Sequence, residues 1–198
     1  NVAVLTRLAD VAYMMEDYAA MADACAKAIE VDEADPQALY LYAKAYRGLG
    51  DVPNAVAMLT KALDKYDDFE AARLLRGETL LANGDVEEAG KDADELLKRI
   101  GANEDVLMLN ARVAKAMGDM EKAEQTYCGV LDVNPFSVDA FAERAEVRRQ
   151  LGNEAGAAED EASAEELRAS QQHPSEDIGE KVKDRMKSMD PYKIFNNE

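Results

Sequence analysis

Small and apolar residues recur along the chain at a fixed interval of 34 positions. Glycine comes at this interval four times, and a small alanine follows each glycine five positions later. The glycines are Gly50, Gly84, Gly118 and Gly152, and the alanines are Ala55, Ala89, Ala123 and Ala157. Self-similarity at one period is typical of repeat architectures. The pattern therefore predicts a chain built from tandem copies of one structural unit.

An acidic or amide residue follows each of these glycines, at Asp51, Asp85, Asp119 and Asn153. Glycine readily adopts the left-handed conformation that ends a helix, and Asp or Asn caps the N–H groups of the next helix. We expect Glu88 to complete a capping box with Asp85. The small alanine allows two helices to approach closely. Each unit is therefore predicted to contain two helices joined by a tight turn.

The period and these positions resemble the tetratricopeptide repeat family, whose unit is a pair of antiparallel helices. The second repeat carries the core residues Leu39, Tyr42, Ala43, Tyr46, Ala55, Leu59 and Ala62, and Pro135 matches the proline that ends a repeat. On this resemblance the repeats cover about 2–35, 36–69, 70–103, 104–137 and 138–171. The resemblance implies an all-α fold, a right-handed superhelical solenoid of five helix pairs in one continuous domain over 1–171.

The first and last repeats depart from the pattern. Glu16 stands where the first repeat should have its glycine. In the fifth repeat Arg148 replaces an aromatic residue and Glu161 replaces a large apolar one. Terminal repeats of solenoids carry polar residues where their outer face meets water. We therefore expect Arg148 and Glu161 to face solvent.

Residues 172–198 lie beyond the repeats. Ile178, Val182, Met186 and Met189 recur at helical spacing, which predicts a C-terminal capping helix over the last repeat. The tail that follows is too apolar for a segment without contacts, because exposed apolar clusters usually mark interfaces. Its residues are Tyr192, Ile194 and Phe195. They either pack back on the solenoid or insert into a neighbouring molecule.

Charge limits the classes of partner. The chain has 41 acidic and 23 basic residues, for a net charge of −18. Such a field repels phosphate backbones and anionic lipid surfaces, so we expect no nucleic acid as a partner. No apolar run approaches the roughly 18 residues that span a bilayer, so we expect no membrane insertion. We favour the cytoplasm as the location, and the start at Asn1 leaves open a preceding targeting segment.

The chain offers little for catalysis or for metal binding. Cys25 and Cys128 are isolated, and we expect both to be small buried apolar residues that pair only if folding brings them together. His173 is the sole histidine. Nucleotide-binding loops and metal-binding motifs are missing from the sequence. We therefore expect a protein that is not an enzyme, with no cofactor and no bound metal.

The resemblance also implies a binding surface, because the first helix of each repeat lines a concave groove in this family. The residues at those positions are Tyr13, Tyr40, Lys44, Arg47, Leu74, Met108, Arg112, Lys115 and Arg149. Apolar side chains beside cationic ones suit a peptide that is anchored by apolar contacts and by hydrogen bonds to carboxylates. The sequence therefore predicts a scaffold or adaptor that binds an acidic or mixed apolar peptide of another protein.

Three alternatives remain at this stage. Glu78, Glu146 and Asp10 on adjacent helices could neutralise the basic groove residues, since alternating charge across packed helices is common. The protein could self-associate as a homo-oligomer through Tyr192, Ile194 and Phe195. It could also be an accessory subunit of a larger complex.

Overall fold

The computed structural model describes residues 1–172, which form ten α-helices and no strand within that range. The expected all-α fold of helix pairs is confirmed. The helices are α1 (Val2–Met14), α2 (Tyr18–Val31), α3 (Pro36–Gly48), α4 (Val52–Lys65), α5 (Glu70–Asn83), α6 (Val86–Ile100), α7 (Glu104–Ala116), α8 (Met120–Val133), α9 (Val138–Gln150) and α10 (Glu154–Gln172).

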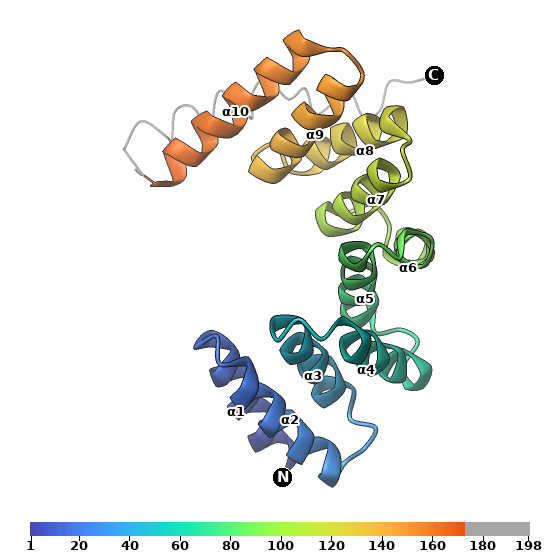
Figure 1. The fold of residues 1–198 in the computed structure, drawn as a ribbon, viewed down its shortest axis with the longest axis vertical. Coiled ribbons are helices and arrows are strands. Elements are labelled where there is room, and N and C mark those ends of the chain that lie inside the picture. Colours follow the sequence, from blue (N-terminus) through green and yellow to red (C-terminus); the bar gives the residue numbers. More distant parts are fainter. Residues whose placement is uncertain (173–198) are drawn as a thin grey trace. The chain divides into compact units, whose positions relative to one another are not determined.

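These helices belong to two units. The first unit, Asn1–Pro135, contains α1 to α8, and the described part of the second unit, which begins at Phe136, contains α9 and α10. In the first unit each helix packs against the next one in the chain, as Figure 1 shows. In addition, α1 contacts α3 and α5 contacts α7. In the second unit α9 packs against α10.

Glycine ends the first helix of each pair, as the repeat pattern predicts. Gly50, Gly84, Gly118 and Gly152 have φ angles of 77°, 91°, 83° and 78°. In the first pair Glu16 takes the same left-handed conformation, with φ 57°. The turn geometry is therefore kept even where the sequence lacks glycine, at the cost of a strained non-glycine backbone.

Most of the second helices begin with a side-chain cap. Asp51 accepts a hydrogen bond from the Asn54 N–H at 3.2 Å, and Asp119 accepts one from the Lys122 N–H at 3.1 Å. The capping box expected at Asp85 and Glu88 is wrong. The Asp85 N–H donates to the Leu80 carbonyl at 2.9 Å, and its carboxylate accepts from the Asn83 amide, so the groups of a capping box are already bonded elsewhere.

Small side chains hold the paired helices together. Ala55, Ala89, Ala123 and Ala157 are all fully or almost fully buried. In the first pair, Ala9 and Ala12 pack with Met21, Ala24 and Cys25 in one apolar cluster. Cys25 is a free thiol whose pKa is raised to about 12 by burial and by the charge of Asp10. Cys128 is also free and is half-buried, so the two cysteines do not form a disulfide.

The polar residues of the fifth repeat divide between interior and surface. Glu161 is exposed and forms an ion pair with Arg149. Arg148 is only 18% exposed, and it donates to the buried Asp160 carboxylate at 3.0 Å and to the Gly156 carbonyl at 3.2 Å. The expectation that Arg148 faces water is therefore wrong, because an acidic partner on the second helix satisfies it inside the unit. The predicted capping helix and the tail residues Tyr192, Ile194 and Phe195 lie outside the described residues.

Candidate functional site

Four of the predicted groove residues come together in one hollow of the first unit. Tyr13, Tyr40, Lys44 and Arg47 line a cavity of about 460 Å³. The remaining lining residues are Tyr18, Gly48, Leu75 and Glu78. We call this hollow the tyrosine pocket. Its walls come from the first helices α1, α3 and α5 and from the start of α2.

The Lys44 ammonium in this pocket makes cation–π contacts with tyrosine rings. The Lys44 ammonium lies 3.6 Å from the centroid of the Tyr13 ring and 5.9 Å from that of Tyr40. Tyr13 in turn meets Tyr18 edge to face, with centroids 6.4 Å apart. An ammonium over a ring face gains about 0.5–1 kcal/mol at such accessible sites. The ring contact positions Lys44 while none of the described carboxylates lies within ion-pair distance of it.

Gly48 makes room for the Tyr18 ring. A Cβ atom at Gly48 would lie 2.3 Å from a carbon of that ring, which is far inside van der Waals contact. The glycine therefore lets the end of α3 approach the start of α2. This close approach places Tyr18 in the pocket wall.

An ion pair closes one side of the pocket. Arg47 Nη1 lies 3.1 Å from Glu78 Oε2, and more than a third of each side chain is exposed. For Arg47, this pairing is the neutralisation that the alternative interpretation expects. The pKa of Tyr40 is raised, first by burial of its ring and then by the nearby charge of Glu78. The phenol of Tyr40 therefore stays protonated and keeps its hydroxyl as a hydrogen-bond donor.

The same ion pair borders a second hollow. Arg47 and Glu78 line a cavity of about 440 Å³ together with Leu81, Ala82, Leu109 and Arg112. We call it the leucine pocket, and we call the two pockets together the groove. Arg47 and Glu78 belong to both walls, so their ion pair lies between the two pockets, whose linings together involve α1, α2, α3, α5 and α7.

Comparison with known proteins decides the family. A model of the tetratricopeptide repeat matches residues 6–68, 40–105 and 108–174, which is most of the chain. The chain belongs to the tetratricopeptide repeat family. Members of this family are in general non-catalytic scaffolds for protein interaction. No curated protein matches the sequence.

Solved tetratricopeptide repeat structures share the fold. MamA from Desulfovibrio magneticus RS-1 superposes with a TM-score of 0.78 at 17% identity, covering 87% of this chain and 97% of that one. TTC0263 from Thermus thermophilus gives a TM-score of 0.71 at 18% identity, with 92% and 96% covered. A tetratricopeptide repeat protein from Parabacteroides merdae gives 0.73 at 19% identity, with 81% and 62% covered. At these identities the likeness establishes the fold.

The other predicted groove residues of this tetratricopeptide chain lie elsewhere. Met108 is buried, and Leu74 packs against the apolar cluster between α5, α6 and α7. Lys115 is half-buried on α7 and lines neither pocket, whereas Arg112 lines the leucine pocket. Arg149 belongs to the second unit, where it pairs with Glu161. The groove therefore contains five of the nine predicted contact residues.

The tetratricopeptide pattern did not identify Tyr18, Gly48, Leu75 or Leu109 as groove residues. The sequence did mark Gly48 as unusual. The turn needs a left-handed backbone only at Gly50, so a second glycine two positions earlier indicates a different requirement, such as a close contact. Tyr18 gave none, since it begins a second helix and the family pattern assigns the groove to first helices. Leu75 and Leu109 occupy a repeat position that the pattern assigned neither to the groove nor to the core.

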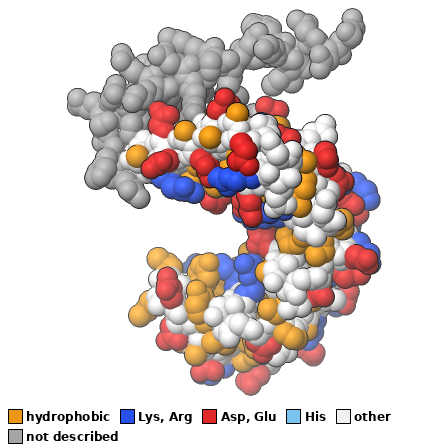
Figure 2. All heavy atoms as spheres, turned by 45° about the horizontal axis from the view of Figure 1, so that its top comes forward, with side chains coloured by type: hydrophobic (Ala, Val, Ile, Leu, Met, Phe, Trp, Pro, Cys, Tyr) orange, Lys and Arg blue, Asp and Glu red, His pale blue; other side chains and the backbone are white. Residues whose placement is uncertain are grey.

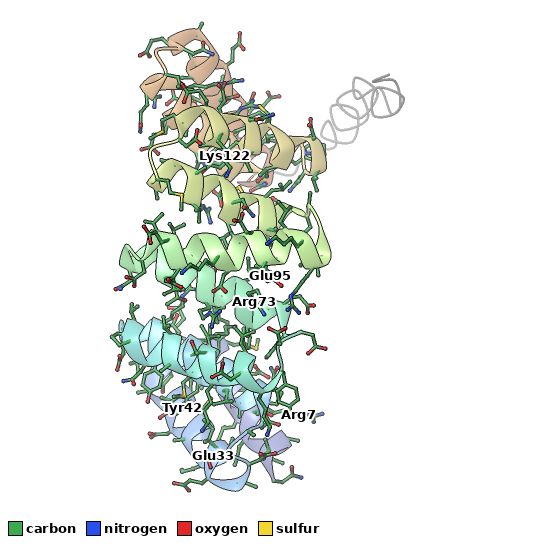
Figure 3. All side chains as sticks on the ribbon, turned by 90° about the vertical axis from the view of Figure 1, so that its right-hand side faces the viewer. Arg7, Glu33, Tyr42, Arg73, Glu95 and Lys122 are labelled. Carbon is green, nitrogen blue, oxygen red and sulfur yellow. The ribbon has the colours of Figure 1, made fainter. Side chains whose placement is uncertain are left out.

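A third hollow of the tetratricopeptide unit is ionic and lies between α4, α5 and α6. Its cavity is about 550 Å³, and its lining includes Arg73 and Glu95, both labelled in Figure 3. Arg76 donates to both oxygens of the buried Asp92, at 2.8 and 2.7 Å. Arg73 donates to the Asp67 carboxylate at 2.6 Å and to the Asp67 carbonyl at 2.8 Å. These cations and anions pair with one another, while the buried Arg73 Nε has no hydrogen-bond partner among the described residues, so the ionic pocket is occupied by structural ion pairs.

Residues 1–172 were also searched for metal-binding clusters and for membrane-spanning helices. No cluster of three or more His, Cys, Asp or Glu side chains there could hold a metal ion. Within the same residues, every helix is too short or too polar to cross a bilayer.

Proposed function

We propose that this tetratricopeptide protein is an adaptor whose groove binds an extended peptide segment of a partner protein, rich in acidic and apolar side chains. The observation that supports the proposal most directly is the convergence of Tyr13, Tyr40, Lys44 and Arg47 on the tyrosine pocket. Three tyrosines and a leucine offer apolar contact area with polar tips, a combination enriched at protein interfaces.

The charge of the groove opposes that of the whole protein. The tyrosine pocket is lined by Lys44 and Arg47 against a single carboxylate, that of Glu78. The full chain has a net charge of −18. A locally cationic groove on an acidic surface attracts acidic segments and repels them elsewhere. This contrast supports a peptide carboxylate as the polar part of the ligand.

A ligand carboxylate can replace Glu78 at Arg47. Ion pairs between partly exposed side chains contribute about 0–1 kcal/mol, so little stability is lost when this one opens. Lys44 presents its ammonium above the Tyr13 ring within the same pocket. Lys44 and Arg47 can therefore bind one carboxylate together, while Tyr13, Tyr18 and Tyr40 contact a neighbouring apolar side chain.

Binding of defined peptides tests the proposal. Fluorescein-labelled peptides of equal length are titrated with the protein, in acidic-aromatic, acidic, neutral and basic versions, and anisotropy is recorded. The native chain should prefer the acidic-aromatic peptide. Reversal of Lys44, Arg47 and Arg112 to Glu should weaken binding by tenfold or more, about 1.4 kcal/mol or above. The same variant pair then serves in affinity capture from a cell lysate.

The matched control reverses three basic residues on second helices. Lys27, Lys65 and Lys98 are exposed on α2, α4 and α6, and their change to Glu alters the net charge equally. This control should bind the acidic-aromatic peptide with a Kd within about threefold of the native value. Equal binding by the groove variant and the native chain would refute the assignment of the groove.

A further inference from the structure

The two pockets of the groove are built from the same repeat positions, one repeat apart. All six residues that line the leucine pocket lie 34 positions after residues that line the tyrosine pocket. In the tyrosine pocket the matching residues are Tyr13, Lys44, Arg47, Gly48, Leu75 and Glu78, and in the leucine pocket they are Arg47, Glu78, Leu81, Ala82, Leu109 and Arg112. Since 34 residues make one repeat, the leucine pocket is the tyrosine pocket moved along the first unit by one repeat.

The two pockets have similar volumes but different walls. Their cavities are about 460 and 440 Å³. The tyrosine pocket is lined by three aromatic rings, those of Tyr13, Tyr18 and Tyr40. The lining of the leucine pocket contains no ring, and its apolar residues are Leu81, Ala82 and Leu109. Rings prefer to pack against other rings, so the first pocket suits an aromatic side chain and the second an aliphatic one.

Arg47 and Glu78 are the residues that both pockets share. Their ion pair separates the pockets, and more than a third of each side chain is exposed, so a ligand reaches it from either side. A ligand carboxylate that takes the place of Glu78 at Arg47 therefore lies between the two pockets. Basic side chains lie beside apolar ones on the N-terminal part of the first unit in Figure 2.

The step of one repeat determines the spacing of ligand side chains that fill both pockets. First helices of successive repeats contact one another directly, α1 with α3 and α5 with α7. Helices packed in this way lie about 8–10 Å apart. In a polyproline II segment residues i and i+3 share one side and are about 9 Å apart. In a β-strand, residues on one side are about 7 or 13 Å apart, so neither spacing fits.

We propose that the groove recognises an extended segment of a partner protein with two apolar anchors three residues apart and an acidic residue between them. The aromatic anchor enters the tyrosine pocket, the aliphatic anchor enters the leucine pocket, and the carboxylate binds Arg47. This inference rests on the proposed function and adds to it the identity and the spacing of the anchors.

Peptides that differ only in anchor spacing test this register. Fluorescein-labelled peptides of equal length and composition contain one phenylalanine, one leucine and one glutamate between them, with serine and glycine elsewhere. The anchors are two, three, four or seven residues apart, and each spacing is made in both orders of the anchors. By anisotropy, the peptide with a spacing of three should bind about tenfold more tightly than those with two or four, because only it buries both anchors.

A filled leucine pocket tests the assignment of the second anchor. Ala82 is exposed on α5, and Ala82→Trp places a large side chain in the leucine pocket. This variant should bind the peptide with a spacing of three about tenfold more weakly. For the same peptide with leucine replaced by serine, its Kd should stay within about twofold of the native value. Ala57→Trp is the matched control, since Ala57 is exposed on α4 and lines neither pocket.

The outcomes separate this inference from the proposed function. Equal affinities at all spacings, with binding still lost on reversal of Lys44, Arg47 and Arg112 to Glu, would overturn the register and leave the adaptor function standing. A preference for a spacing of seven would identify a helical ligand and likewise overturn the register. An equal effect of Ala82→Trp with and without the leucine would overturn the anchor assignment. If no peptide of either series binds, the proposed function fails and the register fails with it.

Discussion

The Arg76 guanidinium donates hydrogen bonds to both carboxylate oxygens of Asp92, sixteen residues further along the chain, at 2.8 and 2.7 Å. Two repeats later Arg144 donates to both carboxylate oxygens of Asp160, again sixteen residues away in the sequence, at 2.8 and 2.6 Å. Asp92 and Asp160 are 3% and 2% exposed. Each pair joins the first helix of a repeat to its second helix. In the first two repeats apolar residues hold these positions, as Leu8 with Ala24 and Tyr42 with Met58.

Removing one partner of this pair should destabilise the protein strongly. Asp92→Asn leaves the Arg76 guanidinium partly buried without its counter-charge, a change that typically costs about 3–5 kcal/mol. The loss is measured as a fall in the midpoint of thermal or urea unfolding followed by circular dichroism. The equivalent Asp160→Asn should act likewise in the second unit.

A matched double variant replaces both members of the ion pair with uncharged residues and so tests whether the charges themselves are needed for stability. Arg76→Tyr with Asp92→Met installs the residues of the second repeat at the same positions. Because well-packed apolar residues often replace a buried ion pair without loss, the double variant should lose clearly less stability than Asp92→Asn alone. It should not fully match the native protein, since the buried Arg73 also loses Asp92 as a counter-charge at 3.7 Å. A loss as large as that of Asp92→Asn alone would contradict this account.

Gly48 should tolerate no side chain. The added Cβ of Gly48→Ala meets the Tyr18 ring, so α2 and α3 must separate or the ring must leave the tyrosine pocket. Overpacking of this kind costs about 1–3 kcal/mol. We expect a lower unfolding midpoint and a weaker affinity for the acidic-aromatic peptide.

Gly129→Ala is the control for this substitution. Gly129 lies inside α8, and a Cβ there would make only an ordinary contact of 3.7 Å with Leu107. Alanine favours helix over glycine by up to about 1 kcal/mol, so this variant should be as stable as the native protein or more stable. Equal effects of the two substitutions would show that the Tyr18 contact is unimportant.

The sequence predicted the helix pairs well because one repeated set of small residues determines them. Gly50, Gly84, Gly118 and Gly152 need left-handed backbone, and this requirement is visible at each position without knowledge of the neighbours. The interior ion pairs were not predicted. Whether Arg148 meets water or Asp160 depends on how two helices are rotated against each other, which composition does not reveal.

Only some of the groove residues were predicted, because contacts between helices decide which side chains reach the pockets. Position alone assigns Tyr40, Leu74 and Met108 to the same place in successive repeats. Tyr40 lines the tyrosine pocket, whereas Leu74 is half-buried against the apolar cluster of α5, α6 and α7, and Met108 is buried. Tyr18 enters the pocket only because Gly48 leaves space for it, a contact between two helices that no single helix pattern encodes.

Replacement of Glu16 by glycine should stabilise the folded protein. Its φ of 57° is unfavourable for a residue with a Cβ, by about 1–2 kcal/mol, while glycine adopts it freely. Part of this gain is lost to the greater freedom of glycine in the unfolded chain. Glu16→Gly should therefore raise the unfolding midpoint modestly, as measured by thermal melting. The reverse comparison, Gly84→Ala, should lower it.

Acid should weaken the contact between the turn after α4 and the end of α6. Hydrogen bonds from Arg99 and then Arg73 lower the pKa of Asp67. A lowered folded-state pKa contributes stability above the unfolded value of about 3.9, and that stability is lost as the pH falls through the folded value. Asp67→Asn should therefore melt below the native protein at pH 7, and the difference should vanish in strong acid.

The neighbouring substitution Asp68→Asn provides the control for the acid experiment. It removes an equal charge one residue away, and no ion pair of Asp68 is present among the described residues. Its melting temperature should follow that of the native protein at both pH values. A difference between Asp67→Asn and the native protein that persists at about pH 2, below the unfolded pKa of Asp, would assign the effect to something other than ionisation.

The position of Tyr13 and Tyr18 in the first helix pair links ligand binding to local unfolding. Among the described helices, α1 and α2 are held on one side only, by α3. Each repeat is stabilised only by its neighbours, so a helix pair with contacts on one side opens more readily than a pair with contacts on both sides. Opening of this pair removes two walls of the tyrosine pocket while α5 to α8 stay folded. If a peptide binds there as proposed, it should hold this helix pair closed and slow amide hydrogen exchange in α1 and α2 far more than in α7 and α8.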